Sequence, residues 1–393
     1  FGKDILEEVK KRPEWPAAFR GDSCEFMKNV SPDATDDADD QAHAEAAKDN
    51  LGARNRWAIV AMDGNDIGRQ QRALDGLPGE EKEKALSKMS KKLRACTRSA
   101  FLHGLAAAVA AWAKRFEEEK KKIAKSNAGK TVLPFRPLIL GGDDILALCH
   151  VEHAFDLARD MAKAFEAESE KDKDCWMATG GKLTISAGVL FCNVGYPLHT
   201  AIPYAESLLA SAKGRFRGKS GEKEPSPAAI DWEAVTENLL DHPADRRRRE
   251  LVFFDGDIEP DGKQLEVSLT RRPYKLYDDK ASGKKVWDAA TFDDLKKLAK
   301  LLEKIPQSVR LEIRRRLYAP WADRCAFVAS LNKNLAVGDE PLSELLKEYD
   351  KTESIGKAWR DETKKDGTTG RDTAICDAIA VLEETRRMRI ETA

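Results

Sequence analysis

The stretch 135–149 places four turn-forming residues, Gly141-Gly142-Asp143-Asp144, between two short apolar runs. Glycine adopts positive φ without a steric penalty, so the Gly-Gly pair predicts a tight reversal between two antiparallel strands. The hairpin then carries two carboxylates at its mouth, and these repel one another unless cations neutralise them. A GGDD tetrapeptide by itself is equally typical of an ordinary turn, so the surrounding sequence has to distinguish the two interpretations.

A second acidic segment precedes the hairpin. Residues 57–62 form an apolar run that predicts a buried strand, and Asp63-Gly64 follows directly at its end. Asp63 is thus a third carboxylate at a strand end, where a neighbouring hairpin can meet it, and the Gly64 carbonyl is a further oxygen ligand. Hard oxygen donors of this kind suit Mg²⁺ or Mn²⁺ better than zinc. An ion held there would bridge the phosphates of a nucleoside triphosphate.

The order of apolar patterns predicts an α+β fold around this hairpin. The expected elements are strands at about 56–62 and 182–191 and helices at about 80–116, 151–169 and 198–213. The first of these helices is either continuous or broken near His103-Gly104. The resulting βαββαβ order predicts a ferredoxin-like split sheet with its helices on one face. In that layout Asp63 faces Asp143 and Asp144.

Composition divides the chain into three parts. Residues 1–55 read as an N-terminal extension that ends in an acidic linker, because 31–50 contains almost no large apolar residues. Residues 56–290 contain the mixed α/β pattern. From residue 291 the apolar spacing is helical throughout, which predicts a separate all-α domain over 291–393.

Charge and cysteine usage narrow the class of protein. The chain has 67 Lys+Arg against 68 Asp+Glu, so bulk charge indicates neither a nucleic-acid coat nor a membrane surface. It contains no CxxC pair and no apolar run of about 18 residues, and its six histidines suggest no metal-ligand spacing. We therefore expect a cytoplasmic protein with no membrane partner. Because the chain opens on Phe1, we also expect that N-terminal sequence has been lost or trimmed.

Short segments along the chain occur in an order typical of one family. They are Asp63–Gly68 (DGNDIG), Ser90-x-x-Leu93, Leu140–Leu148 (LGGDDILAL), Ile185–Val189 (ISAGV), Tyr196–Leu198 (YPL), Ala205–Lys213 (AESLLASAK) and Arg272–Tyr274 (RPY). Over about residues 56–320 they resemble the second palm domain and C-terminal helical domain of the Cas10 family (Cmr2/Csm1), the large subunit of type III CRISPR effectors. Palm domains of this family convert ATP into cyclic oligoadenylates and are related to GGDEF cyclases. The resemblance implies a nucleotidyl cyclase-like palm over 56–290, followed by the all-α helical domain.

The chain also departs from the family. The nuclease domain of the family carries a His-Asp pair, and no His-Asp dipeptide occurs in this sequence. The first palm domain does not fit ahead of residue 56, and the cysteine pairs of the usual zinc element are missing. These differences predict either a fragment or a reduced, stand-alone relative.

The resemblance implies a role for each motif residue. The catalytic metal ligands would be Asp63, Asp143 and Asp144, and the nucleotide-contacting residues Gly64, Gly141, Gly142, Ser90 and Lys213. Lys213 would contact the triphosphate of ATP, and Ser90 the edge of its base. A cation near a helix C-terminus and a serine on a helix are also ordinary surface features, so these two assignments depend on the match. Asp66 is more typical of a loop cap than of a metal ligand.

Several functions remain compatible with these motifs. The first is a metal-dependent nucleotidyltransferase that makes oligoadenylate second messengers in antiviral defence, with crRNA-guided effector subunits, target RNA or a second palm as partners. The alternative is a non-catalytic palm that serves as a scaffold or nucleotide sensor within a ribonucleoprotein. A diguanylate cyclase or a viral-type polymerase fits the tetrapeptide but not its context. The basic run 246–249 could contact RNA, but a solvated loop is the better explanation of it.

Overall fold

The computed structural model of the chain separates into two compact units, residues 1–240 with 388–393 and residues 241–387. The described residues are 2–19, 22–27, 41, 45, 56–118, 123, 125–126, 129–218, 224–235, 241–258, 264–277, 289–303, 306–318, 359–363 and 369–386. The expected linker at 31–50 therefore lies outside the described residues, apart from two isolated positions.

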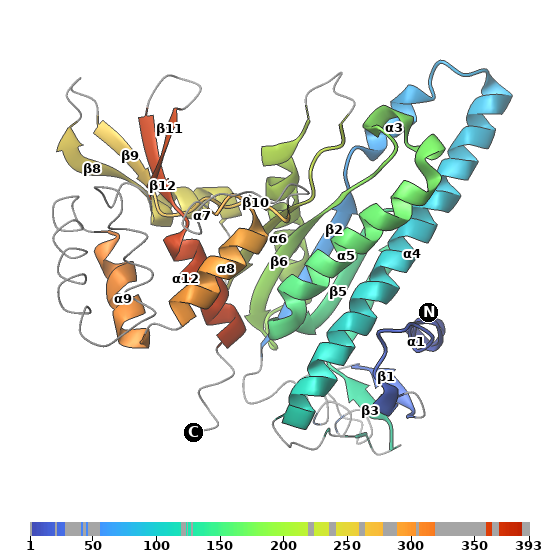
Figure 1. The fold of residues 1–393 in the computed structure, drawn as a ribbon, viewed down its shortest axis with the longest axis horizontal. Coiled ribbons are helices and arrows are strands. Elements are labelled where there is room, and N and C mark those ends of the chain that lie inside the picture. Colours follow the sequence, from blue (N-terminus) through green and yellow to red (C-terminus); the bar gives the residue numbers. More distant parts are fainter. Residues whose placement is uncertain are drawn as a thin grey trace. The chain divides into compact units, whose positions relative to one another are not determined.

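A sheet with the strand order β7-β6-β2-β5-β4 forms the centre of the first unit (Figure 1). Its strands are β2 (Arg56–Gly64), β4 (Phe135–Gly141), β5 (Asp144–His150), β6 (Ile185–Asn193) and β7 (Ala229–Ala234). Strand β2 pairs antiparallel with both β5 and β6, while β7 pairs parallel with β6. The strands β6, β2, β5 and β4 are thus the fourth, first, third and second of the βαββαβ unit, which is the ferredoxin-like arrangement. The predicted α+β fold class is confirmed.

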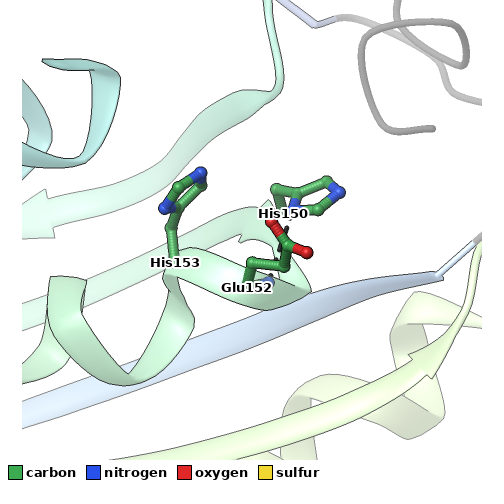
Figure 2. Close-up of side chains that lie close together, drawn as sticks. All are labelled: His150, Glu152 and His153. Atoms are coloured by element: carbon green, nitrogen blue, oxygen red, sulfur yellow. Dashed lines mark hydrogen bonds between the residues drawn. The ribbon is translucent and has the colours of Figure 1, made fainter. Parts of the chain in front are cut away.

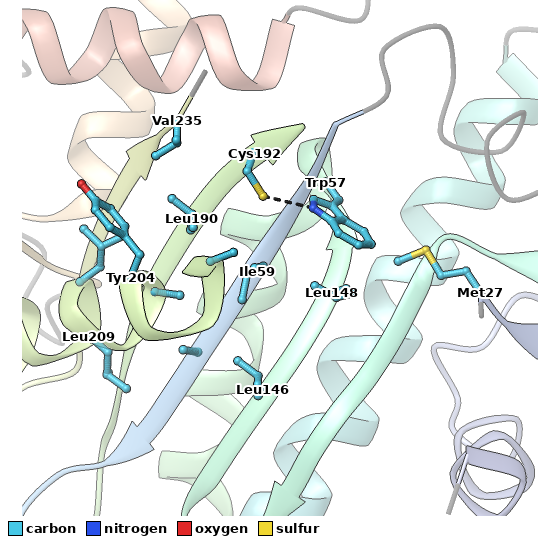
Figure 3. Close-up of a cluster of buried hydrophobic side chains, with 14 of the residues drawn as sticks. Met27, Trp57, Ile59, Leu146, Leu148, Leu190, Cys192, Tyr204, Leu209 and Val235 are labelled. Atoms are coloured by element: carbon cyan, nitrogen blue, oxygen red, sulfur yellow. Dashed lines mark hydrogen bonds between the residues drawn. The ribbon is translucent and has the colours of Figure 1, made fainter. Parts of the chain in front are cut away.

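Helices cover both faces of this sheet. On one face, α6 (Leu198–Phe216) packs its Leu208 and Leu209 against Ile59 of β2 in a single apolar cluster (Figure 3). On the other face, Phe155 of α5 (Ala154–Ser169) stacks edge-on against Phe191 of β6, with ring centroids 5.0 Å apart. The two helices within the βαββαβ unit, α4 (Gly79–Glu118) and α5, pack together on one face as expected, whereas α6, which follows the unit, covers the other face. The central strand is apolar on both sides, so each side needs a covering helix.

The helix α4 (Gly79–Glu118) is continuous over 40 residues. A break near His103-Gly104 was one of two predicted possibilities, and the structure excludes it. A Cβ atom at Gly104 would lie too close to the Met161 side chain of α5, so the glycine allows the two helices to approach closely. The N-terminal helix α1 (Gly2–Val9) joins α4 through an ion pair between Glu8 and Arg98, with an Nε–Oε2 distance of 2.7 Å.

Shorter elements complete the first unit. The strands β1 (Cys24–Phe26) and β3 (Thr131–Leu133) form a parallel pair. A short helix, α3 (Ile67–Ala73), follows β2 directly. The 3₁₀ segments are η1 (Ala17–Phe19), η3 (Val151–His153), η4 (Glu170–Cys175) and η5 (Met177–Thr179).

The second unit combines a sheet with helices. Its elements are α7 (Pro243–Leu251), β8 (Val252–Ile258), β9 (Gln264–Ser268), β10 (Tyr274–Lys275), α8 (Phe292–Glu303), α9 (Gln307–Arg316), β11 (Trp359–Thr363), β12 (Thr369–Thr373) and α12 (Ile375–Arg386). The sheet has the order β11-β12-β9-β8. Helices occur after residue 291 as predicted, but the all-α expectation did not include the β11–β12 hairpin. The basic run 246–249, expected as a loop, lies in α7.

Two further expectations meet the limits of the described residues. Residues 319–358 of the predicted all-α domain lie outside them. Among the helices that are described, none combines the length and the apolar character needed to cross a bilayer.

Candidate active site

The register of the sheet brings Asp63 to the GGDD hairpin. Strand β2 runs antiparallel to β5 with Met62 opposite Ile145, so the next residue, Asp63, is level with Asp144 at the start of β5. Gly64 is in turn level with the hairpin tip, and a Cβ atom on it would lie 3.0 Å from the Cβ of Asp143. A side chain at position 64 would therefore push the hairpin away. Three carboxylates from two strand ends meet at one edge of the sheet.

The pKa values of Asp143 and Asp144 are both raised, in part by the neighbouring Asp63. Burial raises the pKa of Asp143 to about 7, and a hydrogen bond and the charge of Asp63 add to this effect. The pKa of Asp144 is raised as well, by burial and then by Asp63, while the Lys213 ammonium acts in the opposite direction. At neutral pH the cluster is therefore poised to exchange a proton or to bind a cation.

Lys213 supplies the nearest positive charge. It lies in the last turn of α6, and its Nζ donates hydrogen bonds to Oδ2 of Asp63 and, at 2.7 Å, to the carbonyl oxygen of Gly64. The helix places it there because α6 packs on β6 at Gly188, where a Cβ atom would collide with the backbone of Ala205 and Leu209. The sequence analysis assigned Lys213 to the phosphates, and the structure brings it to the carboxylates.

Helix α4 holds the tip of the hairpin. Gly142 has a φ of +64°, which the turn requires and which glycine adopts without strain. Its carbonyl oxygen lies 2.7 Å from the Thr97 hydroxyl, which is also 3.0 Å from the carbonyl of Leu93 within the helix. The sequence analysis did not predict a role for Thr97, because a threonine within a helix gives no signal of a contact with a distant turn. Gly141 lies beside it, exposed, at the end of β4.

Ser90 lies further from the hairpin than the other predicted site residues. It is half-buried on α4, seven residues before Thr97. Seven residues are nearly two helical turns, so Ser90 lies on the same side of α4 about 10 Å further from the hairpin tip. It is not among the residues that line the cleft described below. The structure thus groups Asp63, Asp143, Asp144, Gly64 and Lys213 and leaves Ser90 at the margin.

The loop after β2 is fixed by its own polar side chains. The amide of Asn65 donates to Thr184 Oγ1 at 2.8 Å and accepts from the Ser186 hydroxyl at 3.0 Å. The carboxylate of Asp66 accepts from the backbone N–H of Ser226 at 2.6 Å and pairs with Arg69 at 3.2 Å. Asp66 therefore ties the loop to its neighbours, in the role that the sequence analysis favoured over metal binding.

These residues open into a cleft of about 930 Å³, a volume in the range of small-molecule sites. Asp63, Asp143 and Lys213 lie in its wall. Arg72 and Arg217 add positive charge elsewhere in the lining. The cleft thus combines acidic groups that suit a metal ion with basic groups that suit phosphate.

No curated protein matches the chain. The family model described as the Cas10/Cmr2 second palm domain matches residues 56–220. Residues 56–220 are thus similar to the second palm domain of this family. The chain is weakly similar to a solved structure, the GGDEF domain of DgcB from Caulobacter crescentus in complex with c-di-GMP, with 14% identity, 56% of this chain and 96% of that chain covered, and a TM-score of 0.24. The strand order and the family match establish the palm, and the distant likeness adds nothing to them.

The donor set of this palm domain fits a hard divalent ion. Three carboxylates and the Gly64 carbonyl offer oxygen ligands only, which is the preference of Mg²⁺ and Mn²⁺. The Lys213 ammonium already contacts Asp63 and Gly64, so a cation is accommodated against this pair of oxygens. A metal ion at the same oxygens would require Lys213 to turn away from them.

A second group of potential ligands lies at the far end of β5. His150, Glu152 and His153 have ligand atoms within 4.8 Å of one another (Figure 2). The sequence analysis found no metal-ligand spacing among the histidines and so missed this H-x-E-H segment. However, His150 Nδ1 already accepts the N–H of Glu152 at 3.3 Å, and the Glu152 carboxylate pairs with Arg115. Burial and the Arg115 charge lower the pKa of His153 to about 4. The Arg115 cation neutralises this cluster and would repel a second one.

Proposed function

We propose that this palm domain is a metal-dependent nucleotidyltransferase that converts ATP into cyclic or linear oligoadenylates. The observation that carries the proposal is the meeting of Asp63, from the end of β2, with Asp143 and Asp144, from the β4–β5 hairpin, beside Lys213. Clustered carboxylates destabilise a folded chain unless a cation is bound. A palm that served only as a scaffold would have no need of them.

The proposed reaction joins two nucleotides. The 3′ oxygen of one forms a bond to the α-phosphorus of the other, the bond from that phosphorus to pyrophosphate breaks, and the hydroxyl proton passes to water. Asp63, Asp143 and Asp144, with the Gly64 carbonyl, would hold Mg²⁺ or Mn²⁺, which supplies positive charge against the phosphate oxygens when bound. Lys213 would bind the triphosphate and so offset the charge that develops on the leaving group.

The test is the double variant Asp143→Ala with Asp144→Ala. We expect it to form no product from ATP in the presence of Mn²⁺, as followed by chromatography. Its melting temperature should equal or exceed that of the wild type, because two mutually repelling charges are removed. The matched control, Glu117→Ala with Glu118→Ala, removes two exposed carboxylates at the end of α4 and should leave turnover unchanged. Undiminished turnover in the folded Asp143/Asp144 variant would refute the mechanism.

The same double variant also tests the alternative of a non-catalytic nucleotide sensor, when ATP binding is measured beside product formation. A sensor would bind ATP in the cleft without consuming it, and the Asp143/Asp144 variant would then differ from the wild type in binding alone. We further propose, from the family match, that the palm acts within a type III effector together with its RNA. Because the reaction needs a donor and an acceptor nucleotide, a second palm, including a second copy of this one, is the partner to be sought.

A further inference from the structure

The cleft has an apolar wall that the proposed chemistry does not use. Met177 lines it and is 79% exposed, whereas the other exposed large apolar side chains among the described residues range from 39% to 50%. Single exposed apolar residues are common on protein surfaces and need no explanation by themselves. This one differs because it lies in the same cleft as Asp63, Asp143 and Lys213.

The backbone on both sides of Met177 is firmly held. Trp176 before it is fully buried and donates its indole N–H to the carbonyl of Ser169 at 2.9 Å. After it, Gln70 of α3 accepts the N–H of Ala178 at 3.1 Å and donates to the buried Thr179 hydroxyl at 2.5 Å. The Met177 side chain therefore extends from a fixed segment, which reduces the entropy that a ligand would have to overcome.

The rest of the lining matches a nucleotide in both charge and polarity. Ile67 and Ala178 also contribute apolar atoms to the lining of the cleft. Arg72, Arg217 and Lys213 provide positive charge for phosphates in the same cleft. A ligand with a flat apolar end and a polyanionic end complements this arrangement.

We propose that Met177 is the platform on which the purine ring of the bound nucleoside triphosphate packs. This inference rests on the proposed function, since it places the base of the same nucleotide whose phosphates lie near Lys213. A thioether makes favourable contacts with an aromatic ring and does not read its hydrogen-bonding edge. Met177 thus supports any purine, and the choice between ATP and GTP has to come from another residue. The family resemblance assigns that choice to Ser90, which does not line the cleft.

Oxidation of Met177 by hydrogen peroxide tests the platform without any need for turnover. The methionines at 27, 62, 89 and 161 are at most 6% exposed and serve as internal controls. We expect Met177 sulfoxide to form fastest, as quantified by peptide mass spectrometry, and ATP with Mn²⁺ to slow its formation several-fold. Tripolyphosphate with Mn²⁺ should give no such protection. Equal protection by ATP and tripolyphosphate, or none by ATP when ATP is bound, overturns the inference.

Equilibrium binding of the same ligands separates this inference from the proposed function. Met177→Ala should weaken ATP and GTP alike by about 3- to 10-fold and leave tripolyphosphate unchanged, and Met177→Leu, which keeps the volume, should restore most of the affinity. Leu77→Ala, an exposed apolar residue that does not line the cleft, is the matched control. Unaltered ATP affinity in Met177→Ala contradicts the platform. If neither ATP nor tripolyphosphate binds the wild type, both this inference and the proposed function fail.

Discussion

Asp143 couples proton binding to stability. Its pKa is about 7 in the folded chain, whereas the ordinary value is 3.8. Between these values the folded chain binds more protons than the unfolded chain, so the free energy of unfolding falls as the pH rises from about 4 to about 7. Asp143→Asn removes this titration.

We therefore expect Asp143→Asn to be more stable than the wild type at about pH 8, with the difference vanishing near pH 4. Urea unfolding in the presence of EDTA measures it, because a bound metal would mask the effect. Asp174→Asn, at an exposed position of η4, is the control. A gain in stability that is the same at both pH values would mean that burial and the neighbouring Asp63 do not raise the pKa of Asp143 as described.

Lys213 should have opposite effects on metal and nucleotide binding. Lys213→Ala removes a charge from the phosphates, so use of ATP and GTP should fall alike, by about 10-fold or more if a charged contact of roughly 1.5–3 kcal/mol is lost. The variant also releases the oxygens of Asp63 and Gly64, so Mn²⁺ alone should bind at least as tightly as in the wild type.

Steady-state kinetics and Mn²⁺ titration measure the two effects, with Lys114→Ala, an exposed lysine of α4, as the control. If Lys213→Ala discriminates between ATP and GTP, the lysine lies at the base and not at the phosphates. Ser90→Ala is the complementary variant: it should narrow the preference for ATP over GTP several-fold, as expected for a neutral hydrogen bond of about 1 kcal/mol.

Single residues were predictable where their role follows from the backbone. Asp63 and the GGDD carboxylates could be placed together because a strand end and a hairpin tip have known positions in a βαββαβ sheet. The Thr97 contact and the Met177 platform could not, because each depends on how a helix or a loop lies against a distant segment. The contact of Lys213 with Asp63 could not be predicted either, because it depends on the exact position of α6 on the sheet.

At the scale of elements, the packing of α6 on β6 determines where Lys213 lies. Gly188→Ala adds a Cβ atom that would meet the backbone of Ala205 and Leu209, so α6 has to move. We expect a loss of stability of about 1–3 kcal/mol or more, because overpacking against backbone cannot relax through side-chain rotation. ATP affinity should fall as well, since Lys213 moves with the helix.

Gly214→Ala is the matched control in the same helix. A Cβ atom there meets nothing within 4 Å, so the substitution should stabilise α6 by roughly 0.5–1 kcal/mol through its helix propensity. Thermal unfolding compares the two variants. Equal stability of Gly188→Ala and the wild type would show that the helix and the strand are not in such close contact.

Elements with a strong periodic pattern were predictable and their packing partners were not. The long helix α4 and the central strands follow from apolar spacing alone. The face that α6 covers does not, because a strand that is apolar on both sides accepts a helix on either. The β11–β12 hairpin was missed because a helical pattern on both sides of it drew the expectation toward helices throughout.

At the scale of the whole molecule, the two compact units allow a test of where ligand binding stabilises the chain. All residues that line the cleft belong to residues 1–240. In the second unit, a separate buried group is organised by Asp377, whose carboxylate accepts from the Thr270 hydroxyl at 2.7 Å and the Tyr274 hydroxyl at 2.8 Å. Each unit therefore has its own buried interactions.

Hydrogen exchange should reveal this division. A ligand that binds only the folded state at about 100 times its Kd adds about 2.7 kcal/mol to the stability of the unit that binds it. With Mn²⁺ and a non-hydrolysable ATP analogue, we expect slower exchange in β2, β5 and α6 and no change in β9 and α12. Asp63→Ala, which removes a ligand of the metal, should abolish the protection. If β9 and α12 gain as much protection as β2, the two units unfold as one cooperative structure and the division is wrong.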